Sequence, residues 1–177
     1  MALTQVAGGL IAPSTTLTTP IVATTMGVGG ATPSASGSGI SFPATQSASS
    51  DANTLDDYEE GTWTPAFSNW TTTTGWNFPS GTARYIKIGK MVYISALIAP
   101  GSTSLVCSAN TAALTGMPFQ VVQSGGIGCN SPMAWSSNYI ETLGTGVAYA
   151  SAFIYAPALN VANSRTVFVS GVYETTS

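Results

Sequence analysis

The side chains best suited to chemistry gather in one acidic run at residues 51–60, which reads Asp-Ala-Asn-Thr-Leu-Asp-Asp-Tyr-Glu-Glu and holds five of the seven acids. Two carboxylates that face one cleft can hydrolyse a glycosidic bond, and closely spaced carboxylates can bind calcium. The alternating Asp-x-Asp-x-Asp-Gly pattern of an EF-hand loop is absent, and neighbouring acids tend to diverge. We predict a structural role, with no catalytic, cofactor-binding or metal site; an ion site and a carboxylate pair are the alternatives.

The same run lies where the composition of the chain changes, and we assign residues 51–61 as an acidic hinge. Its simplest structure is a solvated turn or a single helical turn, capped by Asp51 or Thr54. A compact basic group is the expected partner of the acids, and its members are Arg84, Lys87 and Lys90. The hinge residues, with the tryptophan that follows them, are Asp56, Asp57, Tyr58, Glu59, Glu60 and Trp63.

Charge is scarce in the rest of the chain. Four basic and seven acidic side chains make up 6% of the 177 residues, against roughly 25% in an ordinary soluble domain. There is no histidine, which excludes Ser-His-Asp and Cys-His catalysis and zinc sites that use histidine. A net charge of −3 with four scattered bases cannot neutralise a phosphate backbone, so we expect no nucleic-acid partner.

The cysteines and the apolar runs further limit the kinds of disulfide and membrane segment that the chain can contain. Two cysteines, Cys107 and Cys129, are too few for a disulfide framework, and we predict buried reduced thiols, with a single bridge as the alternative. No run reaches the ~18 apolar residues of a membrane-spanning helix. The first residues, Met-Ala-Leu-Thr-Gln-Val, lack the positive region of a secretory signal. We therefore expect that the protein does not insert into a membrane. We also expect that it is made in a cytoplasm.

Residues 1–50 predict an extended, uncharged arm. Ser, Thr, Gly, Ala and Pro fill 36 of these 50 positions and no charge occurs among them, whereas disordered segments normally stay soluble through charge. We expect the arm to lie along partner chains, with a plain flexible tail as the alternative; fully extended it could reach roughly 165 Å. The apolar residues expected to make its assembly contacts are Leu3, Val6, Leu10, Ile11, Leu17, Ile21 and Val22.

Residues 62–177 predict a small antiparallel β-sandwich or jelly-roll domain, because strand-like runs recur every 8–12 residues between turn signals. The clearest pair is Ala83–Ile88 and Met91–Ile98 around a tight turn at Gly89-Lys90. Further strands are expected near 62–67, 103–107, 111–115, 119–123, 146–155 and 166–173.

The alternation within Met91–Ile98 carries a further prediction. Valine, isoleucine, alanine and isoleucine lie on one face, and methionine, tyrosine, serine and leucine lie on the other. Both faces of Val167–Val172 are largely apolar as well. Since one face of an antiparallel sheet is normally wet and polar, two apolar faces imply that the outer one is covered. Another copy of the chain is the simplest cover, so we expect a homo-oligomer.

Tryptophans are the remaining candidates for binding. Trp70 and Trp76 flank a threonine-rich stretch with little strand pattern, and aromatic rings in such a setting could stack on a sugar. Aromatic residues of a small β domain more often belong to the core or to a subunit interface. A contact of Trp70 and Trp76 with host surface glycan is therefore the secondary interpretation.

One stretch of the sequence resembles a known signature. Phe42-Pro-Ala-Thr-Gln46, followed by Asp51-Ala-Asn-Thr-Leu-Asp-Asp-Tyr-Glu-Glu-Gly-Thr-Trp-Thr-Pro65, is similar to a motif that recurs in structural proteins of tailed-bacteriophage virions, most of them tail fibres or tail spikes. The later Tyr85–Gly89 stretch, followed by Val92-Tyr93, and the first ten residues resemble the same proteins. The resemblance is fairly specific over 42–65.

The resemblance implies a non-enzymatic virion component, made in the cytoplasm of a host bacterium and assembled as a homotrimer with other virion proteins. We expect a short fibre-like protein that is anchored by its N-terminal arm and contacts host surface glycan. Such fibres usually carry shaft repeats, and this sequence has none between the arm and the β domain. The alternative is a capsid decoration or cement protein, whose trimers and arms clamp neighbouring capsid subunits.

Overall fold

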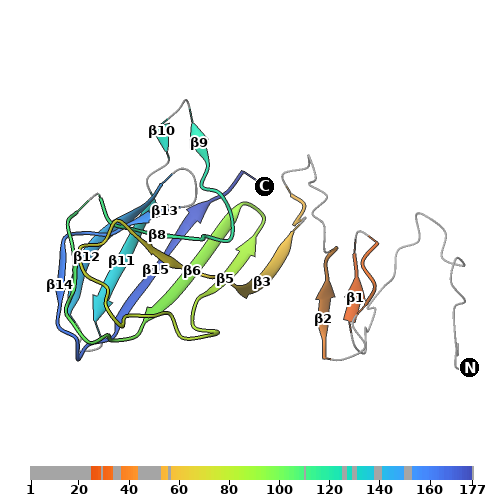
Figure 1. The fold of residues 1–177 in the computed structure, drawn as a ribbon. Coiled ribbons are helices and arrows are strands. Elements are labelled where there is room, and N and C mark those ends of the chain that lie inside the picture. Colours follow the sequence, from red (N-terminus) through yellow and green to blue (C-terminus); the bar gives the residue numbers. More distant parts are fainter. Residues whose placement is uncertain are drawn as a thin grey trace, which may run out of the picture. The chain divides into compact units, whose positions relative to one another are not determined.

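The fold is described from a computed structural model, which defines residues 25–28, 30–33, 37–43, 53–55, 57–109, 111–124, 127–128, 131–137, 141–149 and 153–176. The chain divides into two compact units, Met1–Pro43 and Ala44–Ser177 (Figure 1). In the first unit, strand β1 (Thr25–Gly27) pairs in parallel with β2 (Gly39–Ser41). The seven predicted arm contacts and Asp56 lie outside the described residues.

The second unit is built on one antiparallel sheet, which curls into a half-barrel (Figure 1). Its nine strands, in spatial order, are β3 (Tyr58–Thr62), β5 (Arg84–Ile88), β6 (Met91–Ile98), β15 (Val167–Glu174), β11 (Ser131–Ser137), β12 (Thr142–Tyr149), β13 (Phe153–Tyr155), β8 (Ala113–Thr115) and β4 (Ala66–Ser68). Two smaller antiparallel pairs accompany it: β7 (Leu105–Cys107) with β14 (Leu159–Val161), and β9 (Gln123–Ser124) with β10 (Ile127–Gly128).

The all-β prediction is confirmed, and the clearest predicted hairpin is present. Met91–Ile98 is strand β6, and the turn before it contains Gly89 with a φ of 54°, a left-handed conformation that glycine adopts without strain. The architecture differs from the expected sandwich, because the main strands form a single curled sheet that wraps around its own inner face. The predicted strand at 146–155 is in fact two paired strands, β12 and β13.

Strand β11 was not anticipated, although it lies near the centre of the sheet. A proline such as Pro132 is unusual inside a central strand, because proline lacks the N–H that a ladder requires. In the structure Pro132 lies near the beginning of β11, and pairing with β15 starts one residue later, at Met133. A proline near the start of a strand is compatible with a central position.

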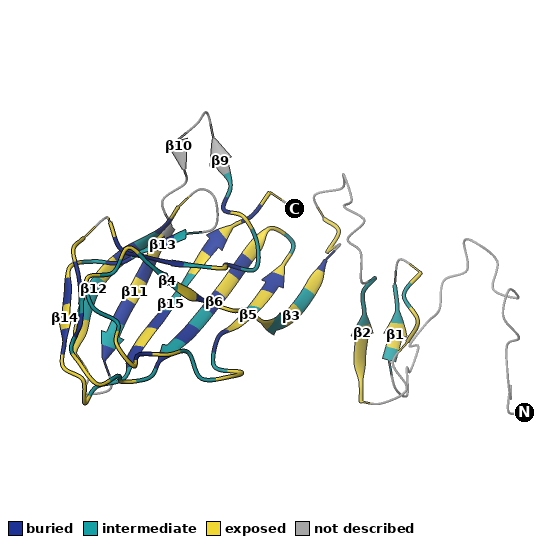
Figure 2. Ribbon diagram, viewed as in Figure 1, coloured by how far each residue is buried: buried dark blue, intermediate teal, exposed yellow. Residues whose placement is uncertain are grey.

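The concave face of the sheet holds the core. Residues of β6 and β15 alternate between buried and exposed (Figure 2). The buried positions include Val92, Ile94, Val167 and Val169, which therefore face the core. Larger side chains fill the interior between these strands and the segments that cross them, and the largest fully buried ones include Trp135, Tyr173, Leu105, Leu114, Met133 and Ile154. This packing fixes which residues of each strand face outward.

Candidate functional site

The candidate site is the outer face of strands β3, β5, β6 and β15, where apolar side chains remain exposed. Strand pairing places Tyr93 directly between Ile86 and Val172, and Met91 between Ile88 and Glu174. The large apolar side chains on this face are 39–51% exposed, and they are Tyr58, Ile86, Ile88, Met91, Tyr93, Phe168 and Val172. We call these seven residues the outer apolar face.

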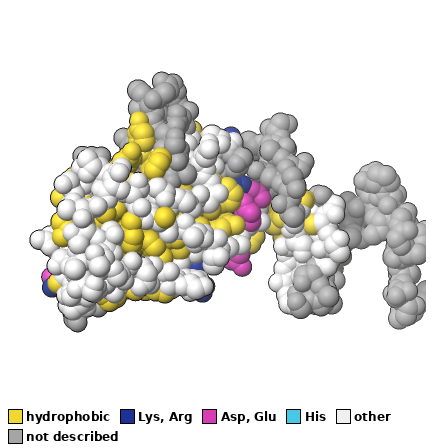
Figure 3. Space-filling view, viewed as in Figure 1, with side chains coloured by type: hydrophobic (Ala, Val, Ile, Leu, Met, Phe, Trp, Pro, Cys, Tyr) yellow, Lys and Arg dark blue, Asp and Glu magenta, His cyan; other side chains and the backbone are white. Residues whose placement is uncertain are grey.

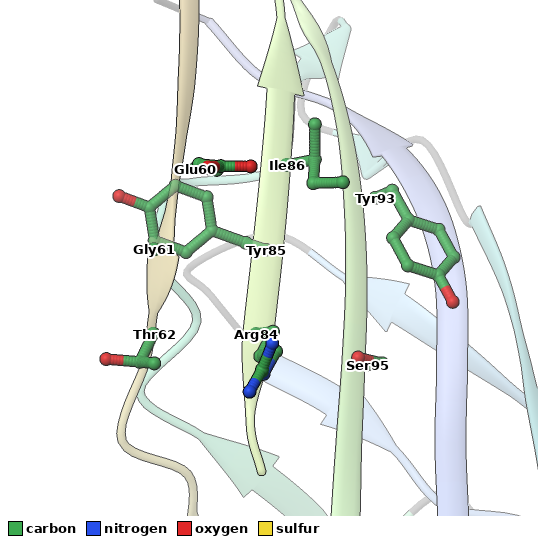
Figure 4. Close-up of a pocket in the computed structure, with 8 residues that line it drawn as sticks. All are labelled: Glu60, Gly61, Thr62, Arg84, Tyr85, Ile86, Tyr93 and Ser95. Atoms are coloured by element: carbon green, nitrogen blue, oxygen red, sulfur yellow. The ribbon is translucent and has the colours of Figure 1, made fainter. Parts of the chain in front are cut away.

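Few charges interrupt the outer apolar face. Glu60, Arg84 and Glu174 share the same side of the sheet, because each alternates with inward-facing neighbours. The space-filling view (Figure 3), which faces the opposite side of these strands from Figure 4, shows acidic side chains near the β3 end. The prediction that β6 has two apolar faces is confirmed, and β5 and β15 extend the outer one.

A hollow of about 400 Å³ lies on this face between β3, β5 and β6 (Figure 4). Its lining residues are Glu60, Gly61, Thr62, Arg84, Tyr85, Ile86, Tyr93 and Ser95. The Arg84 Nε donates a hydrogen bond to the Gly81 carbonyl, at 3.0 Å, which holds the guanidinium at one end of the hollow. A second hollow of about 340 Å³ shares Tyr93 and Ser95 and continues toward Phe168.

The acidic run is not the solvated turn that the sequence suggested. Residues 58–60 belong to strand β3, which pairs with β5 over Tyr58–Thr62. Asp57 is buried and forms an ion pair with Lys87, which is also buried. The Lys87 ammonium lies 5.4 Å from the centre of the Phe119 ring, so a cation–π contact supports the pair. The predicted pairing of the acidic run with the basic group is thus confirmed for Asp57. The prediction that this residue lies in a solvated turn is wrong, because Asp57 is buried.

The two glutamates of β3 point to opposite sides of the sheet, since they are consecutive in a strand. Glu60 accepts a hydrogen bond from the Tyr58 hydroxyl, at 3.1 Å, and this bond raises the pKa of Tyr58. Glu59 lies on the other side, where burial and the Glu59 charge raise the pKa of Tyr85. These two carboxylates therefore do not converge on one cleft.

Other chemical groups are enclosed in the fold. Cys107 is a free, buried thiol whose Sγ donates to the Pro157 carbonyl at 3.3 Å, and burial raises its pKa. Cys129 lies outside the described residues. Among the residues with defined positions, no group of three or more His, Cys, Asp or Glu side chains could hold a metal ion.

The tryptophans are tied into the core by their indole N–H groups. Trp70 donates to the Ala113 carbonyl at 2.9 Å, and Trp76 donates to the Thr103 carbonyl at 2.6 Å. Trp76 is buried and Trp70 partly buried, with the Trp70 ring 5.3 Å from Phe67 in an edge-to-face contact. The structure therefore places Trp76 in the core and leaves Trp70 partly accessible, and a glycan contact of Trp70 and Trp76 stays a prediction.

Sequence reasoning found the outer face through Met91–Ile98 and through the two apolar faces of Val167–Val172. Ile86 and Ile88 were not singled out, although each alternates with an inward residue in its strand. The signal was the same alternation, but Lys87 within β5 made that strand look half polar. The burial of Lys87 against the Phe119 ring depends on Asp57, which lies 30 residues earlier.

Comparison of the chain with models of known protein families, with characterised proteins and with solved structures gives no match. In the part of the chain that the structure describes, no helix is long and apolar enough to cross a membrane.

Proposed function

We propose that this chain is a non-enzymatic structural component of a tailed-bacteriophage virion that works as a homotrimer. In this proposal the chain is short and fibre-like, and residues 1–50 anchor it to other virion proteins. The observation that carries the proposal is the outer apolar face, supported by the resemblance of residues 42–65 to the virion signature. The outer apolar face and the resemblance to virion proteins both favour a chain that assembles with other copies of itself.

The exposed area of this face matches what a subunit interface needs. Each of the seven side chains exposes 39–51% of its surface, which is about 80–100 Å² if a large side chain can bury roughly 200 Å². Seven such residues give on the order of 600 Å² of apolar surface, near the ~800 Å² per partner of a standard interface. This area is at the upper end of the ~300–600 Å² that the largest apolar patch of an ordinary monomer reaches, and such a patch often has a function.

A second copy of the chain is the best-matched cover. Interface cores are depleted of charged residues, and the seven side chains that would meet are all uncharged. Every copy carries the same face, and most oligomers of identical chains close with rotational symmetry. Burial at roughly 25 cal/mol per Å² would then stabilise the assembly without any charged contact at its centre.

A capsid decoration or cement protein is the second candidate. The sequence between the arm and the β domain contains no shaft repeats, which favours a protein that lies close to a particle surface over one that projects far from it. Trimerisation through the outer apolar face serves both roles equally. The two differ in location on the particle.

The assembly is tested by sedimentation of the purified chain at micromolar concentration. We expect a trimer for the wild type and a monomer for Tyr93→Lys, because the substitution would place an ammonium group at the middle of a buried face. Asn160→Lys, at an exposed position of β14, is the control and should leave the trimer intact. A monomeric wild type, or a trimeric Tyr93→Lys variant, would refute the role of this face.

The location is tested by electron microscopy of virions that carry a gold-labelled chain. Label at the tail supports the fibre-like role, and label over the shell supports the cement role. Purified virions without label at either place would refute the proposal that the chain is a virion component.

A further inference from the structure

The nine-stranded sheet ends in two edge strands, β3 and β4 (Figure 1). Strand β4 has only three residues, Ala66–Ser68, and the residue before it is Pro65, which has no N–H to donate. Strand β3 is longer, at Tyr58–Thr62, and among the described residues only β5 pairs with it. We call the side of β3 that faces away from β5 the β3 edge. It is the longer of the two places where a further strand could join the sheet.

The hydrogen bonds at the two ends of β3 show which of its backbone groups are used by β5. The Asp57 carbonyl accepts a hydrogen bond from the Gly89 amide at 3.0 Å. At the other end the Trp63 amide donates to the Ala83 carbonyl at 3.1 Å. Residues that bond to the neighbouring strand alternate with residues that do not along an antiparallel ladder. The residues of this stretch that bond to β5 are therefore the odd-numbered ones.

The same alternation assigns the backbone groups inside β3. Glu59 and Gly61 lie opposite residues of β5 in the ladder and bond to them. The N–H and C=O groups of Glu60 and Thr62 consequently point away from β5, to the β3 edge. No hydrogen bond joins these four groups to any other described residue. They can supply the main-chain bonds of one further strand.

Two acidic side chains lie along the β3 edge. Glu59 is half-buried and Glu60 is exposed, and the two point to opposite sides of the sheet because they are consecutive in a strand. Among the described residues neither takes part in an ion pair. Lys87 lies directly opposite Glu59 in the ladder, but its ammonium is paired with Asp57. The β3 edge is therefore negatively charged at two adjacent positions.

A positive charge lies beside the end of the same edge. Arg84 of β5 is directly opposite Thr62 in the ladder, and its Nε donates to the Gly81 carbonyl. Arg84 and Glu60 line the same hollow (Figure 4), yet they form no ion pair. The β3 edge thus changes from acidic at residues 59 and 60 to basic surroundings at Thr62.

A second copy of β3 is a poor match for this edge. In the fully overlapped antiparallel register, Glu60 of one copy would lie opposite Glu60 of the other, and like charges directly opposite each other destabilise a strand pair. Charged side chains on edge strands commonly prevent such self-pairing. The same repulsion favours a strand that carries the opposite charge.

We infer that the β3 edge binds an extended basic segment of another protein, which adds to the sheet as a strand. Two adjacent basic side chains of the segment lie opposite Glu59 and Glu60. An uncharged side chain lies opposite Thr62, because a base there would meet Arg84. The N–H and C=O groups of Glu60 and Thr62 supply the main-chain bonds, and the charges select the sequence.

The test measures binding of synthetic peptides to the full chain labelled with ¹⁵N. The basic probe is acetyl-Val-Thr-Lys-Lys-Val-Thr-amide, whose antiparallel addition places its lysines opposite Glu60 and Glu59. We expect amide exchange to slow at Glu60 and Thr62 and to stay unchanged at Glu59 and Gly61, which already bond to β5. A Glu-Glu version of the peptide should bind about tenfold more weakly. A Lys-Lys version with N-methyl groups on the residues opposite Glu60 and Thr62 should not bind.

Two variants and one control complete the test. Thr62→Pro removes an N–H that points to the β3 edge and no bond to β5, so it should weaken binding about fivefold to tenfold. Thr62→Val keeps this N–H and is the matched control, which should bind as the wild type does. Glu60→Lys should make the Glu-Glu peptide the better ligand.

Three results would overturn the inference: no binding of the basic peptide, equal binding of its N-methylated form, or an unchanged peptide preference in Glu60→Lys. Sedimentation reports trimer formation separately, so the outcome at the β3 edge does not depend on the outer apolar face.

Discussion

The buried ion pair between Asp57 and Lys87 gives the sharpest quantitative test of the fold. Its side chains are only 6% and 2% exposed, and it joins the residue before β3 to β5. The perturbations are Asp57→Asn, Lys87→Met and the double variant. Each single substitution removes one charge and leaves the other buried, whereas the double variant removes both.

The expected free energies follow from burial. Breaking a buried pair by removing one partner costs about 3–5 kcal/mol, because the remaining charge stays unpaired. For Asp57→Asn the Phe119 ring below the ammonium offsets about 1 kcal/mol, so we expect a loss of about 3 kcal/mol. Lys87→Met should cost about the same. The double variant should cost no more than one single variant, which gives a coupling of about 3 kcal/mol.

Urea unfolding followed by circular dichroism measures all four proteins. The exposed pair Arg165–Glu141, with side chains 31% and 52% exposed, is the matched control, and its cycle with Arg165→Met and Glu141→Gln should give less than about 1 kcal/mol. A coupling for Asp57 and Lys87 that is as small as that of the exposed pair would refute the reasoning that burial makes the pair strong.

Four further predictions concern the outer face, the loop packing, the thiol and the arm. Arg84→Glu leaves only acids on the outer face, so trimers seen by sedimentation should weaken at low salt and recover at 1 M NaCl, where screening is about 3 Å in range; salt independence would contradict this. Gly101→Ala should lower the free energy of unfolding in urea by about 1–3 kcal/mol, because the new Cβ overlaps Trp76; unchanged stability would contradict the packing. Cys107 should react with iodoacetamide far more slowly in the folded than in the unfolded chain, as mass spectrometry of its peptide reports, because burial raises its pKa; equal rates would show an exposed thiol. Deletion of residues 1–40 should leave the trimer intact but abolish incorporation into virions, and normal incorporation would show that the arm is not the anchor.

The sequence was sufficient for features that depend on local alternation. The strand Met91–Ile98, its turn at Gly89-Lys90 and its two apolar faces follow from a period of two with a turn signal before it, and all are present. The same local reasoning predicted a strand at 166–173, and strand β15 (Val167–Glu174) differs from it by one residue at each end. Here each residue's environment is set by its neighbours along the chain.

Features that depend on distant contacts could not be found in this way. Tyr58–Thr62 looked like a polar turn because it contains two glutamates, yet its pairing with β5 makes it an edge strand. Trp76 follows a polar, threonine-rich stretch with little strand pattern, and the sequence alone does not show that the Thr103 carbonyl and Gly101 enclose it from another loop. In both cases the deciding partner lies more than twenty residues away.

In the proposed trimer, the few charges on the outer side of the sheet would help a mostly apolar face to select one arrangement of subunits. An apolar surface alone favours many registers almost equally, and specificity then needs repulsive as well as attractive elements. On the outer face Glu60 and Glu174 lie on different strands, while Arg84 is the basic group beside them. Registers that place acid against acid would be disfavoured, and those that bring Arg84 to an acid of the next copy would be favoured. In the proposed trimer, these three charges around the seven apolar side chains would narrow the set of registers that apolar burial alone allows.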